Sequence, residues 1–73
     1  MIDKTEFAVE MKRNGDTQGI LANDMGYARI TFNRKLNESK GAAFTLPDLS
    51  YLKKRWKLTD SRFIAIFFAD IVS

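Results

Sequence analysis

The sequence predicts an all-α fold, and three observations lead to that prediction. Hydrophobic residues recur three and four positions apart along most of the chain, which is the spacing that one face of a helix requires. Polar residues typical of helix starts precede these segments, and glycines follow several of them. The chain has 73 residues, which suits a single domain with a small core. We therefore expect one domain, residues 1–73, made of five helices and no sheet.

The first helix is expected to begin after Asp3 and to run to about Asn14, where a glycine follows. Asp3 and Glu6 have the spacing of a capping box, in which Asp3 caps the first turn and the Glu6 side chain returns to the backbone of Asp3. Val9 lies off the inward stripe and is expected on the surface. The residues expected to face inward are Phe7, Ala8 and Met11.

The segment from Thr17 to Asn37 predicts two short helices joined by a tight turn. Thr17 is a side-chain cap for the first of them. Gly26 stands where a helix end needs a left-handed backbone, which glycine adopts without penalty. The second helix is expected from about Arg29. The apolar residues at helical spacing in this segment are Ile20, Leu21, Ala22, Met25, Phe32 and Leu36.

A fourth helix is expected after the loop at residues 38–44. Thr45 caps it, Pro47 occupies the first turn, where a missing N–H costs nothing, and Asp48 completes a box-like pattern. Its inward stripe is expected to be Leu46, Leu49, Leu52 and Trp56. Its dense positive charge is expected on a solvated face, formed by Lys53, Lys54, Arg55 and Lys57.

A fifth helix is expected after Thr59 as its cap. Apolar residues surround this helix, so either the domain wraps it fully or part of it forms an exposed interface patch. These residues are Phe63, Ile64, Ile66, Phe67 and Phe68. The tail with Ile71 and Val72 is expected to add an edge strand or to pack in a dimer. The core is expected to combine Phe7, Leu21, Ala22, Met25, Phe32, Leu36, Leu49, Leu52 and Trp56.

Composition argues against several classes of function. The chain has no cysteine and no histidine, which disfavours a zinc site and supplies neither a thiol nucleophile nor an imidazole base. It also lacks a glycine-rich phosphate loop, an apolar run long enough to cross a bilayer and a signal-peptide pattern. Its net charge of +3 permits an anionic partner without requiring one. We therefore expect a binding protein that needs no metal or cofactor.

The expected helix-turn-helix carries a family resemblance. Its residues Gln18, Leu21-Ala22, Met25-Gly26, Phe32 and Leu36-Asn37 resemble the motif of the lambda repressor and Cro-like (XRE) family. The chain is similar to small Cro-like regulators, or repressor modulators, of temperate phages of Gram-positive bacteria. The resemblance implies a compact five-helix lambda-repressor-like domain with its motif at about residues 17–37. It also implies a protein of the host-cell cytoplasm that regulates the lysis–lysogeny switch.

In that family, the start and outer face of the motif's second helix enter the major groove of operator DNA. Carried over by position, Gln18 would hold a phosphate, Arg29 a guanine edge and Asn33 an adenine edge. The phosphate contacts beside the groove would come from Arg34, Lys35 and Lys40. The full set of DNA-binding positions that the resemblance implies is Gln18, Ala28, Arg29, Ile30, Asn33, Arg34, Asn37 and Lys40.

One departure from the family pattern keeps a second function open. The family usually starts this helix with Ser or Thr, whereas Ala28 has no side chain that can cap, and Ile30 adds an apolar residue at the exposed start. The alternative is therefore an antirepressor that binds the phage repressor protein rather than DNA. Homodimerisation through the apolar C-terminal region is also expected. The partner-binding positions in this hypothesis are Arg29, Ile30, Arg34, Phe68 and Ile71.

Overall fold

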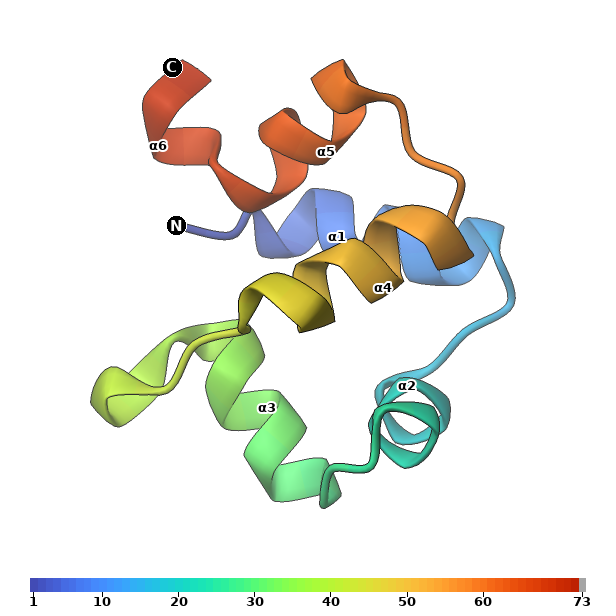
Figure 1. Ribbon diagram of the computed structural model, residues 1–73, viewed down its shortest axis with the longest axis vertical. Helices are drawn as coiled ribbons and strands as arrows, with labels where there is room; N and C mark the ends of the chain where they lie inside the picture. The colour runs from blue at the N-terminus through green and yellow to red at the C-terminus, as the bar shows by residue number, and fades with distance from the viewer. Residues whose placement is uncertain (73) are drawn as a thin grey trace.

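The structure, a computed structural model, describes residues 1–72. Within that range it contains six α-helices, one 3-10 helix and no strand, in a body of 30 × 28 × 21 Å. The all-helical prediction is confirmed, although the number of helices is six rather than five. In chain order the elements are α1 (Lys4–Arg13), α2 (Gln18–Met25), α3 (Arg29–Asn37), η1 (Ser39–Gly41), α4 (Leu46–Arg55), α5 (Asp60–Phe67) and α6 (Ala69–Val72). Figure 1 shows α5 and α6 at one end of the molecule and α2 with the start of α3 at the other.

The sixth helix corrects the expectation of an edge strand in the tail. Phe68, with φ −131° and ψ 44°, ends α5, and the chain turns there before α6 begins. The Ala69 N–H donates to the Met1 carbonyl at 3.2 Å, which holds this turn against the start of the chain. The expected packing of the Val72 side chain lies outside what the structure describes, and so does Ser73.

The four expected N-caps are confirmed, and each cap side chain accepts from the N–H three residues later. Asp3 and Thr17 do so at 3.1 Å, Thr59 at 3.2 Å and Thr45 at 3.3 Å. Thr45 is also part of a reciprocal capping box, because its own N–H donates to the Asp48 carboxylate at 2.9 Å. These caps satisfy backbone donors that the first turn of a helix leaves without a helical partner.

The prediction that the Glu6 side chain accepts from the Asp3 N–H is wrong. The Asp3 N–H donates to the Ile66 carbonyl at 2.7 Å, so it does not need the Glu6 side chain. The Glu6 carboxylate instead accepts from Arg62 Nη1 at 2.7 Å. Arg62 Nε also donates to the buried Glu10 carboxylate at 2.8 Å. Two glutamates of α1 therefore share one arginine of α5, and this pairing joins the two helices.

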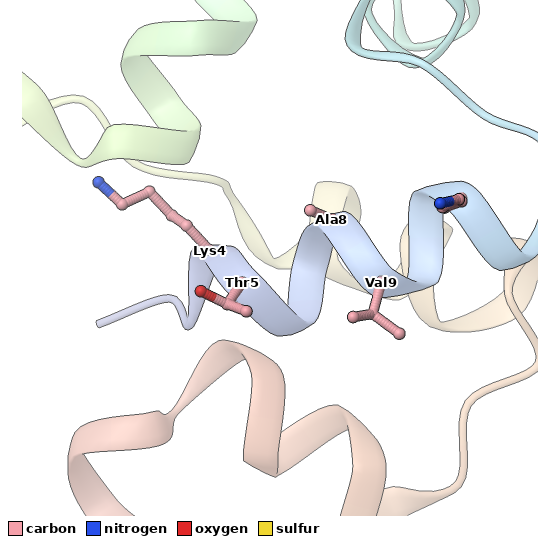
Figure 2. Close-up of a pocket in the computed structure, with 5 residues that line it drawn as sticks. Lys4, Thr5, Ala8 and Val9 are labelled. Atoms are coloured by element: carbon pink, nitrogen blue, oxygen red, sulfur yellow. The ribbon is translucent and has the colours of Figure 1, made fainter.

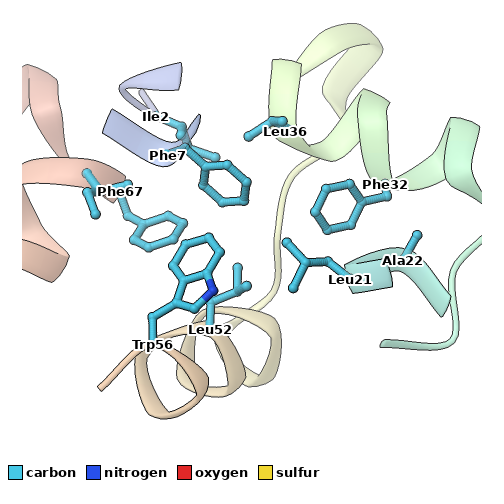
Figure 3. Packing of buried hydrophobic residues seen from close by; sticks show 10 residues of the cluster. Ile2, Phe7, Leu21, Ala22, Phe32, Leu36, Leu52, Trp56 and Phe67 are labelled. Atoms are coloured by element: carbon cyan, nitrogen blue, oxygen red, sulfur yellow. The ribbon is translucent and has the colours of Figure 1, made fainter. Parts of the chain in front are cut away.

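The core lies where α1, α3, α4 and α5 meet, and Phe7 is at its centre (Figure 3). The Phe7 ring lies 5.0 Å from that of Trp56 and 5.9 Å from that of Phe67, both edge-on, which is a favourable aromatic geometry. Of the residues expected in the core, Met25 and Leu49 are partly buried against it and the others are buried. The structure adds Ile2, Ile66 and Phe67 to the buried set.

Some residues expected on inward faces are exposed. They are Ala8, Ile20 and Leu46, and Leu46 has an exposed fraction of 80%. On α1, Glu10 is buried although it is charged, because it forms a salt bridge with Arg62. Leu46 is the first residue of α4 and lies at the edge of the core. The domain covers α5 in part: Ile66 and Phe67 are buried, whereas Ile64 is 39% exposed.

Candidate functional site

Helices α2 and α3 are held together by a turn and a small buried contact. Gly26 has φ 81° and ψ 22°, the left-handed conformation that the sequence predicts, and it ends α2. The next N–H, that of Tyr27, donates to the Ala22 carbonyl at 2.8 Å. Ala22 is buried together with Leu21 and Phe32, so the methyl side chain lets the two helices approach closely. The opposite face of α3 is left to solvent.

Four of the predicted site residues border one surface hollow between α2 and α3: Gln18, Arg29, Ile30 and Asn33. Arg29 and Asn33 are exposed, and Gln18 is half-buried at the first position of α2. Ile30 has an exposed fraction of 61%, which is high for a residue of its size. The hollow therefore combines a cation, two amides and an apolar side chain.

A line of hydrogen bonds crosses this surface from α1 to α2. Lys4 Nζ donates to Asn37 Oδ1 at 3.1 Å, and Asn37 Nδ2 donates to Asn33 Oδ1 at 3.1 Å. Asn33 Nδ2 then donates to Gln18 Oε1 at 3.2 Å. An amide has two donors and two acceptor sites, so Asn33 retains one of each for a ligand. Lys4 is not among the residues predicted for this site, because the packing of α1 beside α3 is what brings it here.

The remaining predicted cations belong to α3 and to η1. Arg34 is exposed on α3, and Lys40 is exposed in η1 with φ 53°. Within residues 1–72, no carboxylate lies within ion-pair distance of Arg29, Arg34 or Lys40. Lys35 differs, because its Nζ donates to the Ala43 carbonyl at 3.0 Å and lies over the Tyr27 ring. Lys35 is therefore occupied within the fold.

The start of α3 lacks a side-chain cap, as the sequence predicts for Ala28. The neighbouring Tyr27 anchors this end instead. Its hydroxyl donates to the Asp48 carboxylate, with both oxygens at 2.9 Å, and Asp48 is buried at the start of α4. Burial, and then the hydrogen bond to Asp48, raises the pKa of Tyr27 above its ordinary value. The tyrosine thus stays protonated and fixes the first turn of α3 relative to α4.

The structure does not bring the two parts of the predicted partner-binding set together. Arg29, Ile30 and Arg34 belong to α3, whereas Phe68 ends α5 and Ile71 lies on α6. The start of α3 and α6 lie at opposite ends of the molecule (Figure 1). Ile71 is 72% exposed, and Phe68 is partly buried beside Met1 and Glu38. The two groups are therefore separate surfaces.

Two further features bear on the kind of site. In the described part of the chain, no group of three or more Asp or Glu side chains is placed to hold a metal ion. Across residues 1–72, no helix has the length and apolar character needed to cross a membrane.

Comparisons of this chain with protein-family models, with curated proteins and with solved structures gave no match.

Proposed function

We propose that this chain is a small helix-turn-helix transcription regulator of the lambda repressor and Cro-like type, and that it binds operator DNA through α3. The observation that carries the proposal is the solvent face of α3, where Arg29, Asn33 and Arg34 are exposed beside Gln18 of α2. In this proposal residues 17–37 are the motif, and the protein acts on the lysis–lysogeny switch in the cytoplasm of a bacterial host.

The distribution of charge supports an anionic partner at this face. Helix α3 contains no acidic residue. Among the carboxylates of residues 1–72, the salt bridges of the lysines and arginines involve Arg13, Lys53, Arg55 and Arg62, all outside α2 and α3. The positive charge of Arg29, Arg34 and Lys40 is therefore uncompensated and available to phosphates.

The polar groups are suited to base edges in the same proposal. Arg29 would donate a bidentate pair to guanine, and Asn33 would use its spare donor and acceptor on adenine. Ile30 would contact a thymine methyl group. Gln18, at the first turn of α2, would hold a phosphate together with the backbone N–H groups of that helix start.

Titration of duplex DNA from the chain's own locus tests the proposal by fluorescence anisotropy at several salt concentrations. Arg29→Ala is expected to lose about 1–3 kcal/mol and to relax the preference at one base pair. Arg34→Ala and Lys40→Ala are expected to weaken binding to all DNA sequences alike. Each should also reduce the slope of the logarithm of the binding constant against the logarithm of the salt concentration by about one unit. Lys54→Ala, an exposed lysine on α4, is the matched control and should leave binding unchanged. Absence of any specific complex at low salt would contradict the proposal.

The exposed Ile30 favours a second candidate function, an antirepressor that binds the phage repressor. A surface for phosphates and base edges gains little from this side chain beyond one methyl contact. A protein interface gains more, because a fully buried apolar side chain contributes about 1.5–3 kcal/mol. In this second proposal the same α3 face docks on the repressor and competes with DNA.

A further inference from the structure

The outward face of α1 forms a shallow groove of its own, on the far side of the helix from its glutamates. Lys4, Thr5, Ala8, Val9 and Lys12 line it. Figure 2 shows Ala8 and Val9 in the middle of this face, with Lys4 extending toward α3. Val9 is 38% exposed. We call these five residues the α1 groove.

Both ends of the α1 groove carry a positive charge that no carboxylate of residues 1–72 neutralises. Lys12 has neither an ion pair nor a hydrogen bond from its side chain in the part of the chain that the structure describes. Within the described residues, Lys4 donates to the neutral amide of Asn37 and to no carboxylate. The two glutamates of α1 are turned toward α5, where Arg62 binds them. The groove is therefore an apolar strip with a lysine at each end, and neither lysine has a carboxylate partner in the part of the chain that the structure describes.

We propose that the α1 groove docks an acidic helical segment of a partner protein. Two carboxylates of that segment pair with Lys4 and Lys12, and one aliphatic side chain between them packs on Ala8 and Val9. The lysines are eight positions apart, a rise of about 12 Å along α1. Two carboxylates seven positions apart on a facing helix span nearly the same length. The small Ala8 side chain lets that helix approach closely.

Charge complementarity selects this occupant over two others. A second copy of this chain would bring four uncompensated lysines together, which is repulsive. A nucleic acid would pair with the lysines, but its phosphates gain nothing from the apolar strip of Ala8 and Val9. An acidic amphipathic helix satisfies both features at once. Docking would also draw Lys4 from Asn37, so the α1 groove is connected to the α3 face through that hydrogen bond.

The test is an NMR titration of the ¹⁵N-labelled protein with a stapled helical peptide. The peptide carries two glutamates seven positions apart and a leucine four positions after the first. Saturable shifts are expected at the amides of Thr5, Ala8 and Val9. Lys12→Glu is expected to weaken binding at least about tenfold, because it turns an attraction into a repulsion. Lys54→Glu, in the equivalent last turn of α4, is the matched control and should bind like the parent protein.

Several outcomes would overturn this inference. One is the absence of shifts at the α1 groove up to millimolar peptide, and another is a set of shifts confined to Arg29 and Arg34. Undiminished binding by Lys12→Glu would exclude the charge pairing. Equal binding of a peptide with glutamine in place of leucine would exclude the apolar contact. Duplex DNA that shifts Thr5, Ala8 and Val9 would identify a nucleic acid as the occupant instead. The results with the peptide do not depend on whether α3 binds DNA.

Discussion

Trp56 donates its indole N–H to the carboxylate of Asp16, with Nε1 and Oδ2 2.8 Å apart. The same carboxylate receives two hydrogen bonds from Arg55, at 3.0 Å from Nε and at 2.7 Å from Nη2. Only 5% of the Asp16 side chain is exposed. Because Asp16 comes directly before the cap of α2, this cluster ties the start of α2 to the end of α4. It thereby fixes one edge of the candidate site to the core.

The first prediction concerns acid stability. The hydrogen bonds from Arg55, and secondarily the one from Trp56, lower the pKa of Asp16 below its ordinary value. A lowered pKa in the folded chain adds stability above the unfolded pKa of about 3.9, and that stability is lost as the pH falls through the folded value. Asp16→Asn should therefore lower the free energy of unfolding at neutral pH and flatten its decline below about pH 4. Urea denaturation across this range measures both effects.

Asp60→Asn is a suitable control for the acid series, because the Asp60 pair with Lys53 is exposed and contributes little. It should shift the urea midpoint at neutral pH much less than Asp16→Asn does. An Asp16→Asn variant that keeps the parent's stability and its acid profile would show that the cluster does not hold α2.

The second prediction concerns the tyrosine that anchors the start of α3. Tyr27→Phe removes the hydroxyl that donates to the buried Asp48. The Asp48 carboxylate would keep its hydrogen bond from the Thr45 N–H but lose the one from the tyrosine hydroxyl. This loss should lower the free energy of unfolding by about 1–3 kcal/mol. Chemical denaturation measures the loss. Tyr51→Phe, which removes exposed hydrogen bonds to Asp24 and from Arg55, is the control and should cost less. A larger loss for Tyr51→Phe would contradict this ranking.

The third prediction concerns the contact between α2 and α3. Ala22 is buried beside the turn, so Ala22→Leu should overpack this contact and cost about 1–3 kcal/mol. Thermal unfolding followed by circular dichroism measures the loss. Ala8→Leu makes the same change at an exposed position of α1 and should leave the melting temperature nearly unchanged. Equal melting temperatures for parent and Ala22→Leu would count against the close packing of the two helices.

Local signals predicted most of the backbone correctly. Thr17, Thr45 and Thr59 cap helices as expected, and Gly26 is left-handed, because each of these features depends on a few adjacent residues. The sixth helix was missed because four residues are too short for a periodic pattern. The burial of Phe7, Phe32 and most of the expected core followed from helical spacing alone.

The sequence could not predict side-chain pairs between distant elements. Glu10 and Arg62 are 52 positions apart, so no periodicity indicates that the glutamate is buried and bonded. The same holds for Lys4 and Asn37, which are 33 positions apart. The resemblance named four residues that the structure brings together at one hollow between α2 and α3. The line of hydrogen bonds that orients Asn33 was not predicted.

The last prediction distinguishes two candidate protein interfaces, one at Ile30 on α3 and one at Ile71 on α6. If the α3 face docks on a repressor, Ile30→Asp places a charge in that interface. The loss of a buried apolar contact, about 1.5–3 kcal/mol, corresponds to roughly ten- to a hundredfold weaker binding. Titration calorimetry against the repressor of the same locus measures this change. Ile71→Asp, at the equally exposed α6 end, is the matched control.

The two variants give opposite results for the two possible interfaces. Because α6 and the start of α3 lie at opposite ends of the molecule, the two substitutions change separate surfaces (Figure 1). A loss confined to Ile30→Asp would assign the interface to α3, where the same variant should also weaken DNA binding through the added negative charge. A loss confined to Ile71→Asp would move the interface to the C-terminal end. If Ile30→Asp binds the repressor as tightly as the parent protein does, the α3 face is not the protein interface.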